Sequence, residues 1–324
     1  MNLNRRMFLY GIASAGFANP ILRASLSLTS RERVDRALQG KDVDRTPFTF
    51  WHHFGLEKLP PARHVQATLE FHQKFRTDLV KVMSDFPYPK PAGQWFEVKK
   101  QSNPFPAQVQ ALRQINQGLD KQAYFVETIF NSWNVAEKLS SPKEVLRLKE
   151  QEPQRLLDAL EIITWSQIQH ARLAISAGAA GIFLAIANAQ DGILSREDYT
   201  KFSEPFDRRI LEWVRSAPLN ILHLHGDKVY LDRFYHDWAA SSINYSTHGT
   251  GVPIAKVRQN YWGVLLAGLD ETRFRSLPPE ELRMEYEKAR DAAGKFFILT
   301  PGCSVPNDSA DAELLRVPQL LKAI

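Results

Sequence analysis

The stretch Leu219-Asn-Ile-Leu-His-Leu-His-Gly-Asp227 joins a short apolar run to two histidines and constrains the fold more than any other part of the sequence. The apolar run predicts a buried β-strand at 219–222, with His223 and His225 at its carboxyl end. Strand side chains repeat every two residues, so both imidazoles point to the same side. Polar residues at this place line the mouth of a barrel of alternating strands and helices.

The same pattern of an apolar run followed by polar residues repeats along the chain. The other expected strands lie at 46–50, 79–83, 123–130, 180–186, 241–245, 263–267 and 296–300. The clearest segments with helical spacing lie at 30–40, 62–76, 142–177, 195–215 and 279–293. Eight strand–helix units in about 290 residues predict an α/β fold, the (β/α)8 TIM-like barrel. A doubly wound sheet is the competing fold, but no Gly-x-Gly-x-x-Gly follows the first strand.

The composition is that of a globular protein with a large core. The chain has 324 residues, of which 44% are hydrophobic and 24% charged, with a net charge of +5. Basic and acidic residues alternate, and the absence of a Lys/Arg stripe argues against a nucleic-acid partner. No Pro/Gly/Ser-rich linker interrupts 29–324, which predicts one domain. We expect its substrate to be a small molecule. The single cysteine, Cys303, excludes an intrachain disulfide.

Residues 1–28 have the pattern of an export leader. Arg5 and Arg6 precede Met-Phe-Leu, and an uncharged stretch rich in Ala and Gly follows at 10–18. Paired arginines in this context resemble the twin-arginine signal, so we expect a periplasmic or secreted protein. The apolar segment is too short to span a bilayer, and stable membrane insertion is not expected. If the segment is instead an amphipathic tail, the protein is cytoplasmic.

His223, His225 and Cys303 are the expected metal ligands. Two imidazoles and one thiolate suit Zn²⁺ with one coordination position left open, and Asp227 is expected to support a ligand from outside this set. The competing interpretation is a hydrogen-bonded histidine pair and a small buried thiol.

Polar residues at the other strand ends are expected to face the same mouth. Asp85 and His53 are the candidate catalytic residues. The candidate substrate-binding residues are His52, Asn131, Asn188, Asn244 and Asp270. Asn188 and Asp270 also suit the simpler role of capping the next helix.

Four segments together resemble the uroporphyrinogen decarboxylase superfamily over about residues 30–324. They are the opening helix and Asp-Arg-Thr-Pro at 31–47, Met-Ser-Asp at 83–85, Gly192–Pro205, and Gly-Cys-Ser-Val-Pro at 302–306. The resemblance implies a TIM-like barrel enzyme, in agreement with the strand count.

One branch of the superfamily holds zinc-dependent methyltransferases that move a methyl group between a corrinoid protein and a thiol. Their ligand pattern resembles His223-Leu-His225-Gly and Gly-Cys303, with His225 in place of a cysteine. The resemblance therefore implies bound zinc, one-carbon transfer to a thiol and a partner protein that carries a corrinoid. Imidazole in place of thiolate makes the site one charge more positive and leaves hydrolytic or other metal chemistry open.

The other branch holds decarboxylases that need no cofactor, and it provides the alternative interpretation. Their carboxylate-binding arginines are missing here, and His53 and Glu57 fall near those positions. We therefore expect a mouth that is not strongly positive and no decarboxylation of uroporphyrinogen. A third possibility is a binding barrel without catalysis.

Overall fold

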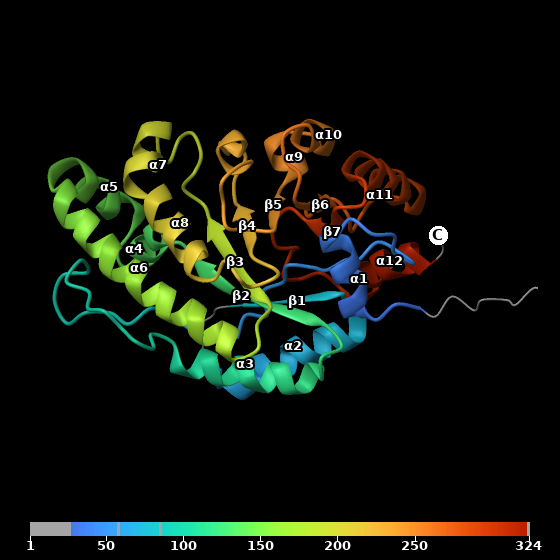
Figure 1. Ribbon diagram of the computed structural model, residues 1–324, viewed down its shortest axis with the longest axis horizontal. Helices are drawn as coiled ribbons and strands as arrows, with labels where there is room; N and C mark the ends of the chain where they lie inside the picture. The colour runs from blue at the N-terminus through green and yellow to red at the C-terminus, as the bar shows by residue number, and fades with distance from the viewer. Residues whose placement is uncertain (1–26, 57–58, 84–85, 323–324) are drawn as a thin grey trace, which may run out of the picture.

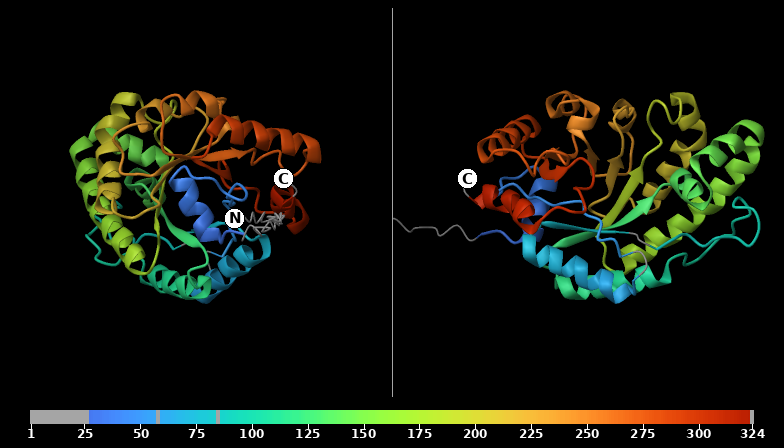
Figure 2. Two further views of the ribbon diagram at one scale, coloured as in Figure 1. Left: turned by 45° about the vertical axis from the view of Figure 1, so that its right-hand side comes forward. Right: turned by 180° about the vertical axis from the view of Figure 1, so that it is seen from behind.

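The computed structural model describes residues 27–56, 59–83 and 86–322, so the expected leader lies outside the described residues as far as residue 26. Parallel strands form one sheet in sequence order. They are β1 (Leu79–Val82), β2 (Tyr124–Phe130), β3 (Gly181–Ile186), β4 (Ile221–Leu224), β5 (Ser242–Tyr245), β6 (Val264–Leu269) and β7 (Phe297–Pro301). The sheet is curled and has helices around its outer side (Figure 1, Figure 2). The fold is therefore TIM-like, and all strands end on one side of the sheet.

The strand expected at 46–50 is reduced to a bridge between Phe48 and Leu299 of β7. The backbone N–H of Leu299 donates to Pro47 at 2.9 Å, and that of Asp78 donates to Phe48 at 2.8 Å. The segment therefore lies between β7 and β1, where the eighth strand of a barrel belongs. A longer ladder does not form because Pro47 has no N–H to donate. In addition, the Thr49 hydroxyl donates to the Leu79 carbonyl, which is then occupied by a side chain.

The helices are mostly started by proline or a polar cap. In chain order they are α1 (Ser30–Leu38), α2 (Pro61–Phe75), α3 (Pro106–Leu119), α4 (Ser132–Leu139), α5 (Pro142–Gln151), α6 (Pro153–Ser176), α7 (Arg196–Phe202), α8 (Glu204–Trp213), the 3-10 turn η1 (Leu231–Phe234), α9 (Thr247–Thr250), α10 (Ile254–Arg258), α11 (Pro279–Ala293) and α12 (Asp311–Lys322). The single helix expected at 142–177 is wrong, because Pro153 starts a new helix. Every helix in the described part of the chain is too short or too polar to cross a membrane.

The inside of the curl is filled by apolar side chains and closed at one end by α1. Val34 and Ala37 of α1 join a buried cluster with Leu79, Phe183 and Leu266, and α1 lies within the ring of helices in Figure 2. Helix α1 contacts the amino ends of the strands. The opposite end, where the strands finish, is thus left for the functional site.

Candidate metal centre

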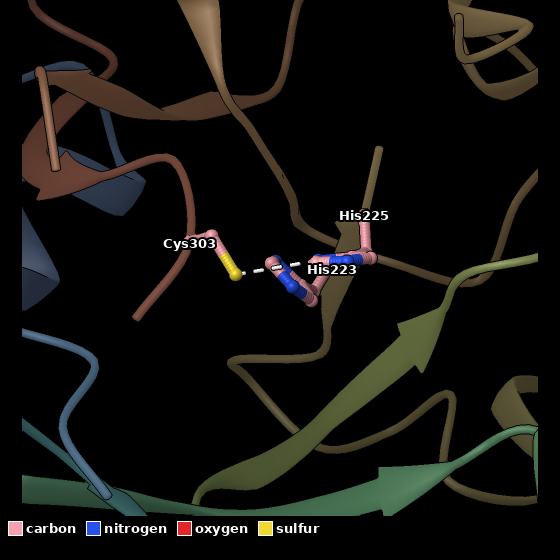
Figure 3. Close-up of side chains that lie close together, drawn as sticks. All are labelled: His223, His225 and Cys303. Atoms are coloured by element: carbon pink, nitrogen blue, oxygen red, sulfur yellow. Dashed lines mark hydrogen bonds between the residues drawn. The ribbon is translucent and has the colours of Figure 1, made fainter. Parts of the chain in front are cut away.

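Three side chains predicted as metal ligands come together at the carboxyl ends of β4 and β7. His223 lies in β4, His225 follows it, and Cys303 follows β7. Their possible ligand atoms all lie within 4.8 Å of one another. The Cys303 Sγ is 3.2 Å from His225 Nδ1, and Figure 3 shows the three side chains pointing toward one another.

Asn244 determines which nitrogen of the His223 ring is left for a metal. The two residues are partners in the register between β4 and β5. The Asn244 amide donates to the carbonyls of Leu266 at 2.7 Å and Pro301 at 3.0 Å. This orientation turns its Oδ1 toward His223 Nδ1 at 2.6 Å. Since Oδ1 can only accept, Nδ1 carries a proton, and Nε2 is the ring nitrogen that can give a lone pair to a metal.

Two aromatic residues hold the His223 ring in this orientation. The Trp51 indole N–H donates to the same Asn244 oxygen at 3.0 Å. Phe183 stacks on the His223 ring, with centroids 4.7 Å apart. His223 is only 7% exposed, so the ring is fixed from two sides before any ion binds.

The glycine after His225 is required by the turn that carries the histidine. Gly226 has φ +127°, and a Cβ there would lie within 2.2 Å of the Gln190 side chain. The Gln190 amide donates to the His225 carbonyl at 3.1 Å. A side chain at position 226 would displace Gln190 and with it the His225 backbone.

The glycine before Cys303 has a different role, namely close approach to β5. A Cβ on Gly302 would lie 2.1 Å from the Cα of Ser246. The Gly302 N–H donates to Glu271 at 3.0 Å. Contact with the end of β5 and the hydrogen bond to Glu271 therefore place Cys303 against the histidines. Sequence reasoning did not identify Glu271 or Gln190 as supporting residues.

The donor set suits a zinc ion. Burial raises the pKa of the Cys303 thiol, but the hydrogen bonds and charges of His223 and His225 outweigh burial and lower it to about 5. The same hydrogen bond raises the pKa of His225. The sulfur is therefore a thiolate at neutral pH, the form that binds metals. Donor atoms on one tetrahedral zinc ion lie about 3.3–3.8 Å apart, a spacing within reach of side-chain rotation because His225 is exposed.

A cavity of about 420 Å³ contains the three ligands. Its other walls are mainly apolar and include Phe130, Phe183 and Ala185. A second cavity of about 320 Å³ adjoins it. His53, Met83, Thr128, Phe130 and Lys138 line both cavities. The ligand cluster therefore faces a space large enough for a small molecule.

The sequence profile of the family described as uroporphyrinogen decarboxylase (URO-D) matches residues 92–322. The chain belongs to this family. The comparison with curated proteins found no match.

Solved structures with a similar fold are distant in sequence. A methyltransferase from Methanosarcina mazei is 16% identical, with a TM-score of 0.73, and the match covers 92% of this chain and 99% of that one. A B12-independent methionine synthase from Shewanella sp. W3-18-1 is 11% identical, with a TM-score of 0.58, over 86% and 93% of the two chains. At these identities the likeness shows a shared fold.

Of the two expected catalytic residues, His53 lines both cavities. Asp85, the position that resembles the strand-end aspartate of the uroporphyrinogen decarboxylase family, lies outside the described residues.

Asn131 and Asn188 form a buried network in place of the substrate contacts expected of them. Both are 0% exposed. The Asn131 side chain caps α4 by accepting from Asn134 N–H at 3.0 Å, and its amide donates to Asn188 at 2.8 Å and to Asp207 at 3.2 Å. Asn131 is thus used by the helix cap and Asn188 by the bond to Asn131, and neither residue lines the two cavities.

The remaining expected substrate contacts also lie elsewhere. His52 packs against Phe54 and Phe71. Consecutive residues of an extended segment point to opposite sides, so His53 lines the cavities and His52 does not. Asp270 accepts from the backbone and hydroxyl of Thr272 as a turn cap. Asn244 is buried and supports His223, the role that had been expected of Asp227.

Three lysines line the cavities although the family's arginines are missing. Lys81 and Lys138 line the cavity of the ligand cluster, and Lys90 and Lys138 line the adjoining one. Glu137 is the acidic residue among the described lining residues. Lysines from β1, α4 and the loop after β1 thus supply positive charge from other places than the family's arginine motif.

Proposed function

We propose that this chain is a zinc-dependent enzyme that transfers a methyl or other one-carbon group to a thiol. The observation that carries the proposal is the convergence of His223, His225 and Cys303, with the His223 tautomer set by Asn244. The names of the two fold neighbours, a methyltransferase and a methionine synthase, support the reaction class. The proposed methyl donor is a corrinoid carried by a partner protein.

The protein's own groups would hold the ion in distinct ways. Nε2 of His223 is preset as a lone-pair donor, whereas His225 and Cys303 meet through Nδ1 and Sγ. A zinc ion there supplies Lewis acidity, which lowers the pKa of a thiol and favours its nucleophilic form. Three protein ligands leave one position for the acceptor.

The cavity walls would exclude water and orient the acceptor. Phe130, Phe183 and Ala185 cover the apolar side of the cavity, and Lys81 adds a positive charge beside the ligand cluster. Exclusion of water strengthens electrostatic interactions within the cavity.

The first test is zinc content together with transfer. We expect about one zinc per chain in the purified protein, and transfer of the methyl group of methylcobalamin to homocysteine or another small thiol. Cys303→Ser should lose both zinc and transfer. The matched control is Ser304→Ala, since Ser304 lines the same cavity next to Cys303. Transfer that persists after complete removal of zinc would contradict the proposal.

The second test separates the two branches of the family. With lysines at other positions than the decarboxylase arginines, we expect no conversion of uroporphyrinogen by the purified protein. Conversion that continues in Cys303→Ser would favour a decarboxylase that needs no metal.

A further inference from the structure

The inner cavity, the one of about 320 Å³ beside the ligand cluster, has an aromatic wall. Phe86, Tyr88, Phe105 and Phe130 line it. Phe105 packs edge-on against Tyr88, with centroids 6.0 Å apart. Walls of this kind favour a flat apolar group such as an aromatic ring, because ring faces and edges pack well against one another.

Two buried polar side chains interrupt this wall, and both come from α6. Gln167 and His170 are three residues apart and therefore lie on the same face of the helix. They are 2% and 1% exposed, and both line the inner cavity. The Gln167 amide N–H donates to the Phe130 carbonyl at 3.1 Å, which leaves its Oε1 without a hydrogen-bond partner.

The His170 ring offers a second buried polar atom without a partner. Its Nε2 lies 2.9 Å from the buried carboxylate of Glu127, which also accepts from the Gln108 amide. A carboxylate only accepts, so Nε2 donates to Glu127, and Nδ1 is the ring nitrogen left to meet a ligand. Nδ1 has no hydrogen-bond partner. Buried acceptors without partners are costly, and the cost falls when a ligand supplies a donor.

We infer that the inner cavity is a binding subsite for an aromatic ring that carries a hydroxyl or amino group. The ring packs against Phe105 and Phe130, and its hydroxyl or amino group donates to Gln167 Oε1, with His170 Nδ1 as the other polar atom of the wall. Because the two cavities share a wall, the substrate is an elongated molecule whose other end reaches the ligand cluster. That last step rests on the proposed function, whereas the ring subsite does not.

The probes are phenol and toluene, which differ by a hydroxyl in place of a methyl group. Titration calorimetry on the full chain should show phenol binding about tenfold more tightly than toluene, since a site built for a hydroxyl rejects the analogue without one. Gln167→Met, which keeps the length of the side chain, should remove most of that preference. Gln169→Met is the matched control on α6, because Gln169 is half-buried and does not line the cavity; it should keep the preference.

Phenol binding is also measured with Cys303→Ser. Residue 303 lines the cavity of about 420 Å³ that contains the ligand cluster, and it does not line the inner cavity. Unchanged phenol binding by this variant would support the subsite even if methyl transfer is never found. Equal binding of phenol and toluene by the wild-type protein would overturn the inference without touching the proposed function. So would an unchanged preference in Gln167→Met, or no saturable binding of phenol.

Discussion

The Asn244 side-chain oxygen lies 2.6 Å from His223 Nδ1, across two neighbouring strands. Asn244 is 0% exposed, and its amide is fixed by the Leu266 and Pro301 carbonyls. Neither the oxygen nor the ring can turn without breaking several hydrogen bonds. The sheet therefore fixes which ring nitrogen of His223 is left for a metal.

Asn244→Ala should weaken zinc binding by about 10–100-fold, the usual cost of losing a group that orients a metal-binding histidine. Without the acceptor, Nδ1 and Nε2 of His223 compete for the proton. The measurement is zinc affinity by competition with a chelator. Asn188→Ala is the control, because Asn188 is equally buried but lies in another network. Equal losses in both variants would mean that Asn244 acts through stability alone.

His225→Cys should keep zinc and raise the rate of methyl transfer severalfold. His225 uses Nδ1, the ring nitrogen nearer the backbone, so a cysteine sulfur falls close to the same place. A second thiolate adds negative charge and makes a zinc-bound acceptor thiol more electron-rich. His223→Cys is the contrasting variant: His223 presents Nε2, the farther nitrogen, so a shorter side chain should lose zinc. Faster transfer is measured as initial rates with zinc-loaded protein, and a slower rate in His225→Cys would count against a thiol acceptor.

Asp207 should make the protein less stable as the pH rises from about 4 to about 7. Burial raises the pKa of this carboxyl to about 7, although hydrogen bonds from Asn131, Ser203 and Tyr199 oppose the rise. The unfolded chain ionises near pH 4, so the folded protein holds one extra proton between these values. Stabilisation from this group is thus complete below pH 4 and lost as the pH passes 7.

Asp207→Asn should remove this dependence, by an amount on the order of 3–4 kcal/mol between pH 4 and pH 8. The measurement is the free energy of unfolding in urea across this range. Asp158→Asn, at an exposed position on α6, is the control and should run parallel to the wild type. A curve for Asp207→Asn that also stays parallel would show that the carboxyl is ionised in the folded protein.

The ligand cluster followed from the sequence because two simple rules sufficed. His223 and His225 share a side by strand periodicity, and the carboxyl ends of parallel strands meet at one place. Cys303 was placed at the same end of the sheet because the strand before it, β7, was predicted correctly. The helix break at Pro153 also follows from the sequence, because proline favours the first turn of a new helix.

Other features depend on registers and on competing partners, which a single sequence does not contain. Nothing before the structure pairs Asn244 with His223, since the register between β4 and β5 sets it. Asn131 follows the end of β2, yet its side chain caps α4 and donates to Asn188 and Asp207. The expected strand at 46–50 is short because of Pro47 and because Phe48 is hydrogen-bonded to Asp78, 30 residues further along the chain.

Export is the remaining prediction, and it rests on the sequence of the leader. Twin-arginine export distinguishes guanidinium groups from ammonium groups, so Arg5→Lys with Arg6→Lys should keep the charge and still hold the protein in the cytoplasm. Arg23→Lys is the matched control, because it makes the same exchange outside the arginine pair. The measurement is the share of protein in the periplasmic fraction of a host with this pathway. A folded protein carried in this way would keep a zinc ion loaded inside the cell, so exported wild-type protein should contain zinc. Unchanged export of the double variant would mean that a different signal carries the protein, and absence of the wild-type protein from the periplasmic fraction would mean a cytoplasmic protein.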